Sequence, residues 1–196
     1  MDILNKDKLK QVLEKWKGHP SITDLMDRFD KLQTYTKKKF EKKPKYDLIE
    51  LHDIDVKEDP VRPELTLEFR QKYGRKIYGL KDEEGDIAAI MCFAFTHDVP
   101  KTVEEMDRLS YDAAMQATHR AGVQGDIAIA YTVWAKKRGG GTAIVNEVYK
   151  MIKKSHHLNR LVTLSPLTEM ARNFHLRNGA RELSVNEKTQ NFEYQI

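Results

Sequence analysis

The chain of 196 residues is about as long as one ordinary domain, and its 40% of hydrophobic residues are enough to form a buried core. No apolar run approaches the roughly 20 residues of a membrane-spanning helix and no signal-like apolar block opens the chain, so we expect a soluble, cytoplasmic protein. The net charge of +4 suits an anionic partner, which could be nucleic acid, a membrane surface or a phosphorylated cofactor. Charge alone does not choose among these three, so the choice depends on sequence motifs.

The first 45 residues predict a short helical N-terminal segment. Apolar residues recur at helical spacing over 3–17 and 22–41, and the turn-like stretch GHPS separates the two runs. The lysines of KKKFEKKPK fit a solvated helix end better than a nucleic-acid patch, because aromatic residues are not interleaved with them.

A sheet is predicted from Tyr46 onward. Residues 46–54 alternate like a half-buried strand, and residues 75–82 and 87–95 flank the turn EEGD, which predicts an antiparallel hairpin. Cys92, the only cysteine, lies inside this apolar run and is assigned to the core, so a disulfide and a cysteine zinc site within one chain are excluded. Short helices are expected over 63–74 and 102–117.

The second half of the chain alternates strands and helices. A strand at 126–135 leads through the glycine loop KKRGGG into a helix predicted from Thr142 to Lys154. A strand at 160–166, a helix at 169–179 and strands at 180–185 and 191–196 follow. We therefore predict a mixed α/β domain over residues 46–196, without internal repeats.

The glycine loop is typical of a site that holds a pyrophosphate. A helix amino terminus exposes unpaired N–H groups, and glycines let a ligand approach the backbone closely. The basic residues Lys136, Lys137 and Arg138 would add attraction, while a flexible loop before a capped helix remains an equal alternative. The two common nucleotide-binding patterns, G-x-x-x-x-G-K-[ST] and an early G-x-G-x-x-G, are not present.

Two motifs resemble the GNAT acetyltransferase superfamily. The loop fits the superfamily's pattern R-x-x-G-x-A at Arg138, Gly141 and Ala143. A later segment resembles the second conserved segment of the superfamily at Ala171, Phe174, His175, Gly179 and Ala180. The resemblance implies an acetyltransferase-like, mixed and mostly antiparallel sheet flanked by helices, with a coenzyme A thioester as ligand. The ligand-binding residues that it implies are Val133, Trp134, Ala135, Arg138, Gly139, Gly140, Gly141, Thr142 and Ala143.

A closer resemblance covers residues 76–196. The stretches AIAYTV, GTAIVNEVYKMIKK, LVTLSP, NFHLRNGA and NFEY are similar to the catalytic domain of malonyl-CoA decarboxylase, a family with the same fold. In that family the serine of T-L-S-P and the histidine of F-H-L-x-N-G-A form the catalytic pair, which implies Ser165 and His175 here. Family members carry a large helical domain before this one and a longer segment between the two motifs, whereas only ten positions separate the pair in this chain.

Three functions remain open. Decarboxylation of malonyl-CoA to acetyl-CoA needs a held carboxylate, a stabilised enolate and a proton donor, which a serine, a histidine and the amides around Val133–Ala135 would supply without a metal. N-acyl transfer from acetyl-CoA needs a base for the amine, such as Glu187, Asp126 or a water molecule. The third function is an inactive acyl-CoA sensor. Nucleic acid and membrane are not needed to explain the basic charge, and a homo-oligomer stays open.

The motif residues also have plain structural explanations. Ser165 before Pro166 would end a strand or cap the next helix, and His175 would be a satisfied core histidine. The neighbouring His156 and His157 lack further ligands at metal-binding spacing, so a solvated helix end is expected there.

Overall fold

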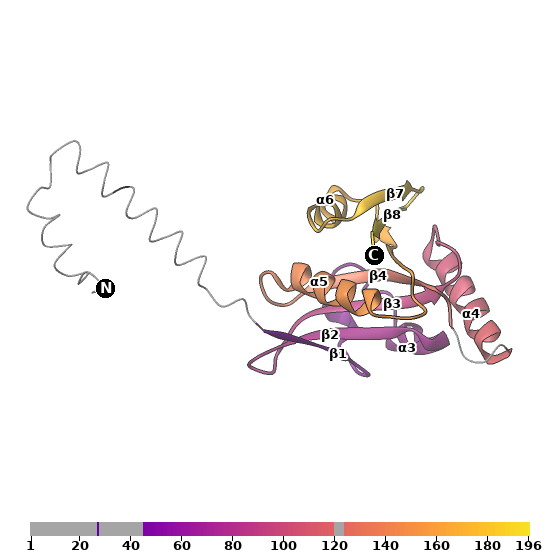
Figure 1. Cartoon of the computed structure of the whole chain (residues 1–196), viewed down its shortest axis with the longest axis horizontal. Helices are drawn as coiled ribbons and strands as arrows, with labels where there is room; N and C mark the ends of the chain where they lie inside the picture. Colours follow the sequence, from indigo (N-terminus) through magenta and orange to yellow (C-terminus); the bar gives the residue numbers. More distant parts are fainter. Residues whose placement is uncertain (1–26, 28–44, 120–123) are drawn as a thin grey trace, which may run out of the picture. The chain divides into compact units, whose positions relative to one another are not determined.

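The computed structural model describes residue 27 and residues 45–119 and 124–196 (Figure 1). The predicted helices at 3–17 and 22–41 therefore lie outside the described residues, apart from Asp27, which is helical. Residues Lys45–Ile196 form one compact unit, and this unit carries the site.

One sheet organises this unit, in the strand order β1-β2-β3-β4-β5-β8-β6 with β7 paired to β8. The described strands are β1 Tyr46–Glu50, β2 Lys76–Asp82, β3 Ile87–Thr96, β4 Ile127–Ala135, β5 Arg160–Thr163, β6 Ser165–Pro166, β7 Arg181–Val185 and β8 Thr189–Tyr194. Among these pairs only β4 and β5 run parallel, since a helical crossover joins them. The predicted mixed, mostly antiparallel sheet is confirmed.

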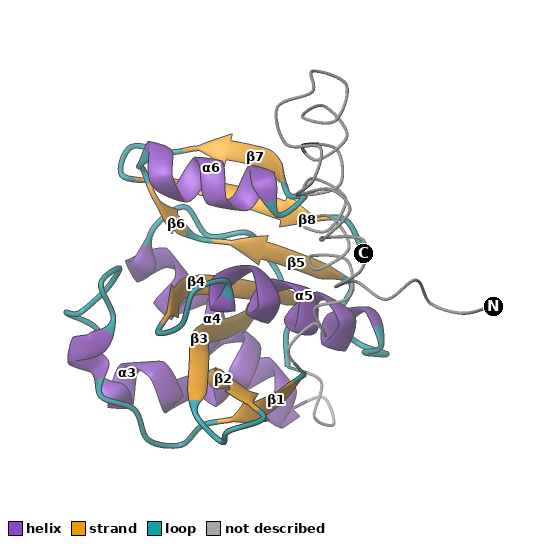
Figure 2. Cartoon of the chain, turned by 90° about the vertical axis from the view of Figure 1, so that its left-hand side faces the viewer, coloured by secondary structure: helices purple, strands orange, loops and turns teal. Residues whose placement is uncertain are grey.

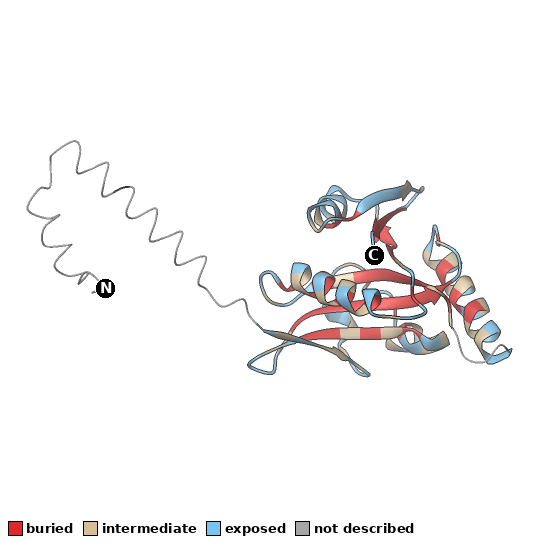
Figure 3. Ribbon diagram, in the orientation of Figure 1, coloured by how far each residue is buried: buried red, intermediate tan, exposed pale blue. Residues whose placement is uncertain are grey.

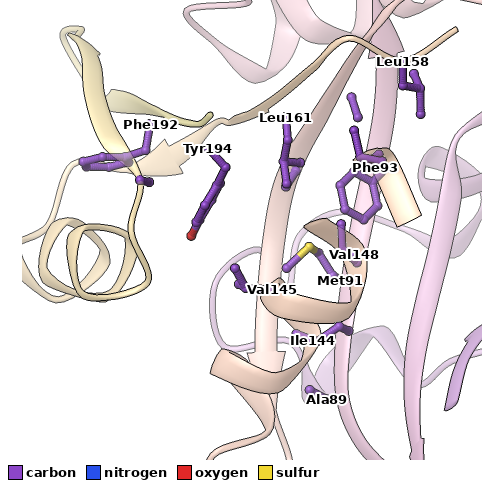
Figure 4. Close-up of a cluster of buried hydrophobic side chains, with 14 of the residues drawn as sticks. Ala89, Met91, Phe93, Ile144, Val145, Val148, Leu158, Leu161, Phe192 and Tyr194 are labelled. Carbon is purple, nitrogen blue, oxygen red and sulfur yellow. The ribbon is translucent and has the colours of Figure 1, made fainter. Parts of the chain in front are cut away.

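Helices and short turns cover both faces of this sheet (Figure 2). They are η1 Val56–Glu58, α3 Leu67–Gln71, η2 Lys72–Gly74, α4 Val103–His119, α5 Gly140–Lys153 and α6 Glu169–Arg177. On one face Ile144 and Val148 of α5 pack against Met91 of β3, as Figure 4 shows. These residues belong to one apolar cluster. On the other face Met106 of α4 is fully buried in a second apolar cluster, together with Ile90 and Cys92 of β3. Strands β3 and β4 lie between the two clusters and are buried along most of their length (Figure 3).

Strand β4 loses its partner on one side halfway along. It pairs with β3 over its whole length, but with β5 only over Ile127–Ala130. The β3 register shifts at the same place, so Tyr131 is the extra residue of a β-bulge. Beyond Ala130 the strands β4 and β5 separate, and the gap between them opens next to the amino terminus of α5 and beside α6.

Several predicted boundaries differ from the structure. The helix expected over 63–74 shrinks to Leu67–Gln71, because the side chain of Thr66 caps its start and Tyr73 and Gly74 have φ values of 57° and 69°. The helix expected from Thr142 already begins at Gly140. The strand expected over 160–166 divides at Leu164, where the chain passes from β5 to β6.

Candidate active site

Ser165 and His175 lie in direct hydrogen-bonding contact. Ser165 Oγ is 2.8 Å from His175 Nε2. Both residues are buried, with exposed fractions of 5% for Ser165 and 4% for His175. Ser165 begins β6, and α6 starts four residues later with Thr168 as its cap, whose hydroxyl accepts the amide of Ala171. This tight connection turns the second helical turn of α6 back over the end of β6, which brings the predicted pair together.

The pair belongs to a longer chain of hydrogen bonds. His175 Nδ1 is 2.9 Å from the Tyr194 hydroxyl, and Ser165 Oγ donates to Thr163 Oγ1 at 3.1 Å. Thr163 Oγ1 also accepts the backbone amide of Phe192 at 3.1 Å. Neither Tyr194 nor Thr163 was named as a site residue from the sequence. Both owe their place to the pairing of β8 with β5 and β6, which local spacing does not reveal.

Burial keeps the imidazole of His175 neutral at neutral pH. Desolvation lowers its pKa from 6.5 to about 4, since the described surroundings offer hydroxyls and aromatic rings rather than a carboxylate. The ring stacks on Phe192 with 5.1 Å between centroids. Burial also raises the pKa of Tyr194, so its phenol stays protonated and can either donate to Nδ1 or accept from it.

A cavity of about 280 Å³ adjoins this chain of hydrogen bonds in the gap between β4 and β5. Of the predicted ligand residues, Val133, Trp134, Ala135 and Gly141 line it together with Ser165 and His175. The other predicted residues do not line it and flank Gly141 on the loop and first turn of α5: Arg138, Gly139, Gly140, Thr142 and Ala143. No Asp, Glu, Lys or Arg is among the described residues lining the cavity.

The glycine loop needs its glycines for two separate reasons. Gly139 has a φ of 82° and caps α5 in the left-handed conformation. A Cβ at Gly140 would lie 2.5 Å from the carbonyl oxygen of Ala88, so only glycine fits against β3 there. The amides of Gly141 and Thr142 have no hydrogen-bond acceptor among the described residues, and they remain available at the amino end of the helix dipole.

The basic residues of this loop do not act alike. Lys136 pairs with Glu58, and Lys137 Nζ lies 2.6 Å, 3.2 Å and 2.9 Å from carboxylate oxygens of Asp82, Glu84 and Asp86. Those carboxylates raise the pKa of Lys137, and their negative charge offsets its own. The expectation that both lysines reinforce an anion site is therefore wrong. Exposed Arg138 has no ion-pair partner in the described part of the chain.

The side chains considered for other chemistry lie elsewhere. Asp126 bonds to His97 at 3.0 Å and to Asn159 at 2.9 Å, and neither Asp126 nor Glu187 lines the cavity. Within residues 45–119 and 124–196, the acidic cluster Asp82, Glu84 and Asp86 is the only group of metal-ligand type, and Lys137 sits against it. None of the described helices has the length and apolar character needed to cross a bilayer.

Comparison with solved structures finds matches in two groups of proteins. The chain is similar to malonyl-CoA decarboxylase from Agrobacterium vitis, with a TM-score of 0.56, 15% identity, and coverage of 97% of this chain and 69% of that one. Malonyl-CoA decarboxylase from Cupriavidus metallidurans matches with a TM-score of 0.43 and 18% identity over 63% of this chain and 31% of its own. The N-acetyltransferase PseH from Campylobacter jejuni, solved with acetyl coenzyme A, matches with a TM-score of 0.49 and 11% identity over 77% and 99%.

The likeness to malonyl-CoA decarboxylase is thereby confirmed at the level of fold. A scan against family models and a search of curated proteins find no match.

Proposed function

We propose that the protein binds an acyl-CoA thioester in the gap between β4 and β5 and decarboxylates malonyl-CoA, or a related malonyl thioester, to acetyl-CoA. The observation that carries the proposal is the buried hydrogen bond of 2.8 Å between Ser165 and His175 at a cavity without ionised lining residues. The fold shared with a malonyl-CoA decarboxylase supports it.

The glycine loop is assigned to the pyrophosphate of the coenzyme. The unpaired amides of Gly141 and Thr142 point from the start of α5, where the helix dipole favours an anion. Arg138 adds the one positive charge of the loop that no described carboxylate offsets. The acyl end then reaches Val133–Ala135 in the cavity, where amides of the separated strand β4 polarise the thioester carbonyl.

The apolar cavity favours loss of a carboxylate. A carboxylate that enters it gives up water and gains only neutral partners, the hydroxyl of Ser165 and the imidazole of His175. In the transition state the charge spreads onto the thioester oxygen, so the transition state is less penalised by desolvation than the ground state. The bond between the α-carbon and the carboxylate breaks, its electron pair forms the enolate, and CO2 leaves.

The enolate then takes one proton at its α-carbon. His175 passes this proton on from solvent. The negative charge that forms on the enolate raises the low pKa of the ring, so the imidazole takes up the proton once CO2 has left and delivers it to the α-carbon. Tyr194 at Nδ1 holds the ring so that Nε2 faces Ser165 and the cavity. In total, the reaction consumes one malonyl thioester and one proton and forms one acetyl thioester and one CO2.

N-acyl transfer to an amine is the second candidate. It is favoured by one observation, the neutral imidazole of His175, which can accept the proton of an attacking amine. The two carboxylates considered as bases, Asp126 and Glu187, do not line the cavity. An inactive acyl-CoA sensor would bind the thioester through the same loop but would catalyse neither decarboxylation nor N-acyl transfer.

The test is incubation of purified protein with malonyl-CoA in D2O, with mass spectrometry of the thioesters. We expect acetyl-CoA with one deuterium on its methyl group, and loss of activity in Ser165→Ala and His175→Gln. The matched controls Ser184→Ala and His157→Gln remove the same groups outside the cavity and should stay active. Malonyl-CoA that binds without conversion contradicts the decarboxylase, and acetyl-CoA consumption with amines would then favour transfer.

A further inference from the structure

The separation of β4 from β5 leaves two backbone carbonyls without a partner strand. One is the carbonyl of Tyr131, the extra residue of the bulge, and the other is that of Leu164, between β5 and β6. Arg62 binds both: its Nε donates to Tyr131 O at 2.9 Å and its terminal nitrogen donates to Leu164 O at 3.0 Å. One planar group with several donors thus satisfies both sides of the gap.

We infer that Arg62 is a positioning residue for the proposed reaction, on which this inference rests. Leu164 directly precedes Ser165, and Tyr131 lies two residues before Val133, which lines the cavity. By joining the two carbonyls, Arg62 sets the distance between the hydroxyl of Ser165 and the strand assigned to the thioester. Displacements of about 1 Å at such a distance cost up to about a hundredfold in rate.

Arg62 is itself held by a buried group of charged side chains. Asp59 accepts the amide of Arg62 at 3.2 Å and pairs with Arg70 at 2.8 Å, and Arg70 also donates to the carbonyl of Arg62 at 2.7 Å. The bulge turns Thr132 toward the same carboxylate, which its hydroxyl reaches at 2.9 Å. We call Asp59, Arg62 and Arg70 the Arg62 clamp. All three are buried, with exposed fractions of 0%, 8% and 0%, so the clamp has a fixed geometry.

The clamp also reaches the cavity directly. Pro60 and Val61, between its first two members, line the cavity, and Leu65 packs in the apolar cluster on the α4 face of the sheet. A shift of the clamp would therefore move part of the cavity wall as well as the two carbonyls.

Arg62→Lys tests this role against Arg75→Lys as the matched control. Arg75 is an equally buried guanidinium, 3% exposed, whose partners Phe69, Asp107 and Ser110 lie away from the cavity. For Arg62→Lys we expect turnover of malonyl-CoA at least about tenfold lower with coenzyme A affinity within about twofold of the wild type. Arg75→Lys should keep turnover within about twofold at a similar loss of thermal stability.

Two further readouts separate positioning from simple destabilisation. Methylguanidine added to Arg62→Ala should restore part of the turnover, since it can occupy the vacated site and bridge both carbonyls. The nitrogen NMR signal of His175 Nε2 should shift in Arg62→Lys and not in Arg75→Lys, because it reports the hydrogen bond between His175 and Ser165 without any turnover.

Three results would overturn the inference or divide it from the proposed function. Unchanged turnover and an unchanged His175 signal in Arg62→Lys overturn it, as do equal losses in Arg62→Lys and Arg75→Lys. If the wild-type protein does not convert malonyl-CoA, the proposed function fails. The His175 signal then decides alone: a shift confined to Arg62→Lys supports a clamp that positions Ser165, and its absence rejects one.

Discussion

Tyr194 reaches His175 from the last strand of the sheet, with its hydroxyl 2.9 Å from the imidazole Nδ1. The nitrogen that faces Tyr194 is the one that does not face Ser165, so the phenol fixes which edge of the ring is presented to the cavity. Tyr194 is therefore a third residue of the site, and its role can be tested by mutation.

Tyr194→Phe removes only that hydroxyl. We expect turnover to fall by at least about tenfold because the imidazole loses its orientation and its partner for proton exchange. Unfolding free energy should fall by about 1 to 2 kcal/mol, since Nδ1 is left buried without a partner. Steady-state kinetics and denaturant unfolding measure the two effects. Tyr149→Phe is the control, as its hydroxyl donates to Gln195 O at 2.9 Å outside the cavity; equal rates in both variants would deny Tyr194 its role.

The motif residues were the part of the site that could be predicted from sequence. Ser165 and His175 stand on a strand end and the following helix, ten positions apart, and such a short connection leaves few arrangements. Their contact follows from local geometry together with the family resemblance. The mixed, mostly antiparallel sheet was also predictable, because alternation and helical spacing change clearly along residues 46–196.

Residues that act through long-range pairing were not predictable. Tyr194 depends on the register between β5 and β8, and Arg62 on contacts with Tyr131 and Leu164, which lie 69 and 102 residues away in the chain. A lone arginine between Val61 and Pro63 has no periodicity to mark it. The pairing of Lys137 with the β2–β3 hairpin is likewise tertiary, which is why charge counting overstated the basic character of the loop.

His175 should make folding stability depend on pH. Its folded-state pKa of about 4 lies below the unfolded value of 6.5, so the unfolded chain binds more protons between these values. Its contribution is complete above pH 6.5 and is lost as the pH falls toward 4, by up to about 3 kcal/mol.

Denaturant unfolding at a series of pH values measures this loss. His175→Gln cannot take up the proton, so the difference in unfolding free energy between wild type and variant should shrink as the pH falls from 6.5 to 4. His157→Gln, at an exposed position, controls for the general effect of acid on the carboxylates. A constant difference across that range would show that His175 is not buried as a neutral ring.

Gly141 tests the anion site at the start of α5. Gly141→Asp places a negative charge beside the free amides and should weaken coenzyme A binding by at least about tenfold. A Cβ at this position would lie 3.2 Å from the ring of Phe174, so some of the effect is steric. Gly141→Ala adds the same Cβ without the charge and isolates that part. Calorimetric titration with coenzyme A measures the affinity of both variants. Equal affinities would show that the charge at position 141 does not affect binding and that the loop does not act through electrostatics.

Arg138 supplies the loop charge that remains free for a ligand. Arg138→Gln should weaken coenzyme A binding by about fivefold at low salt, and the difference from wild type should diminish at high salt because the residue is exposed. Lys154→Gln removes one positive charge at the opposite end of α5 and is the matched control. The measurement is calorimetric titration at two ionic strengths. If Lys154→Gln weakens binding as much as Arg138→Gln, only the net charge of the protein attracts the coenzyme, and Arg138 makes no specific contact with its phosphates.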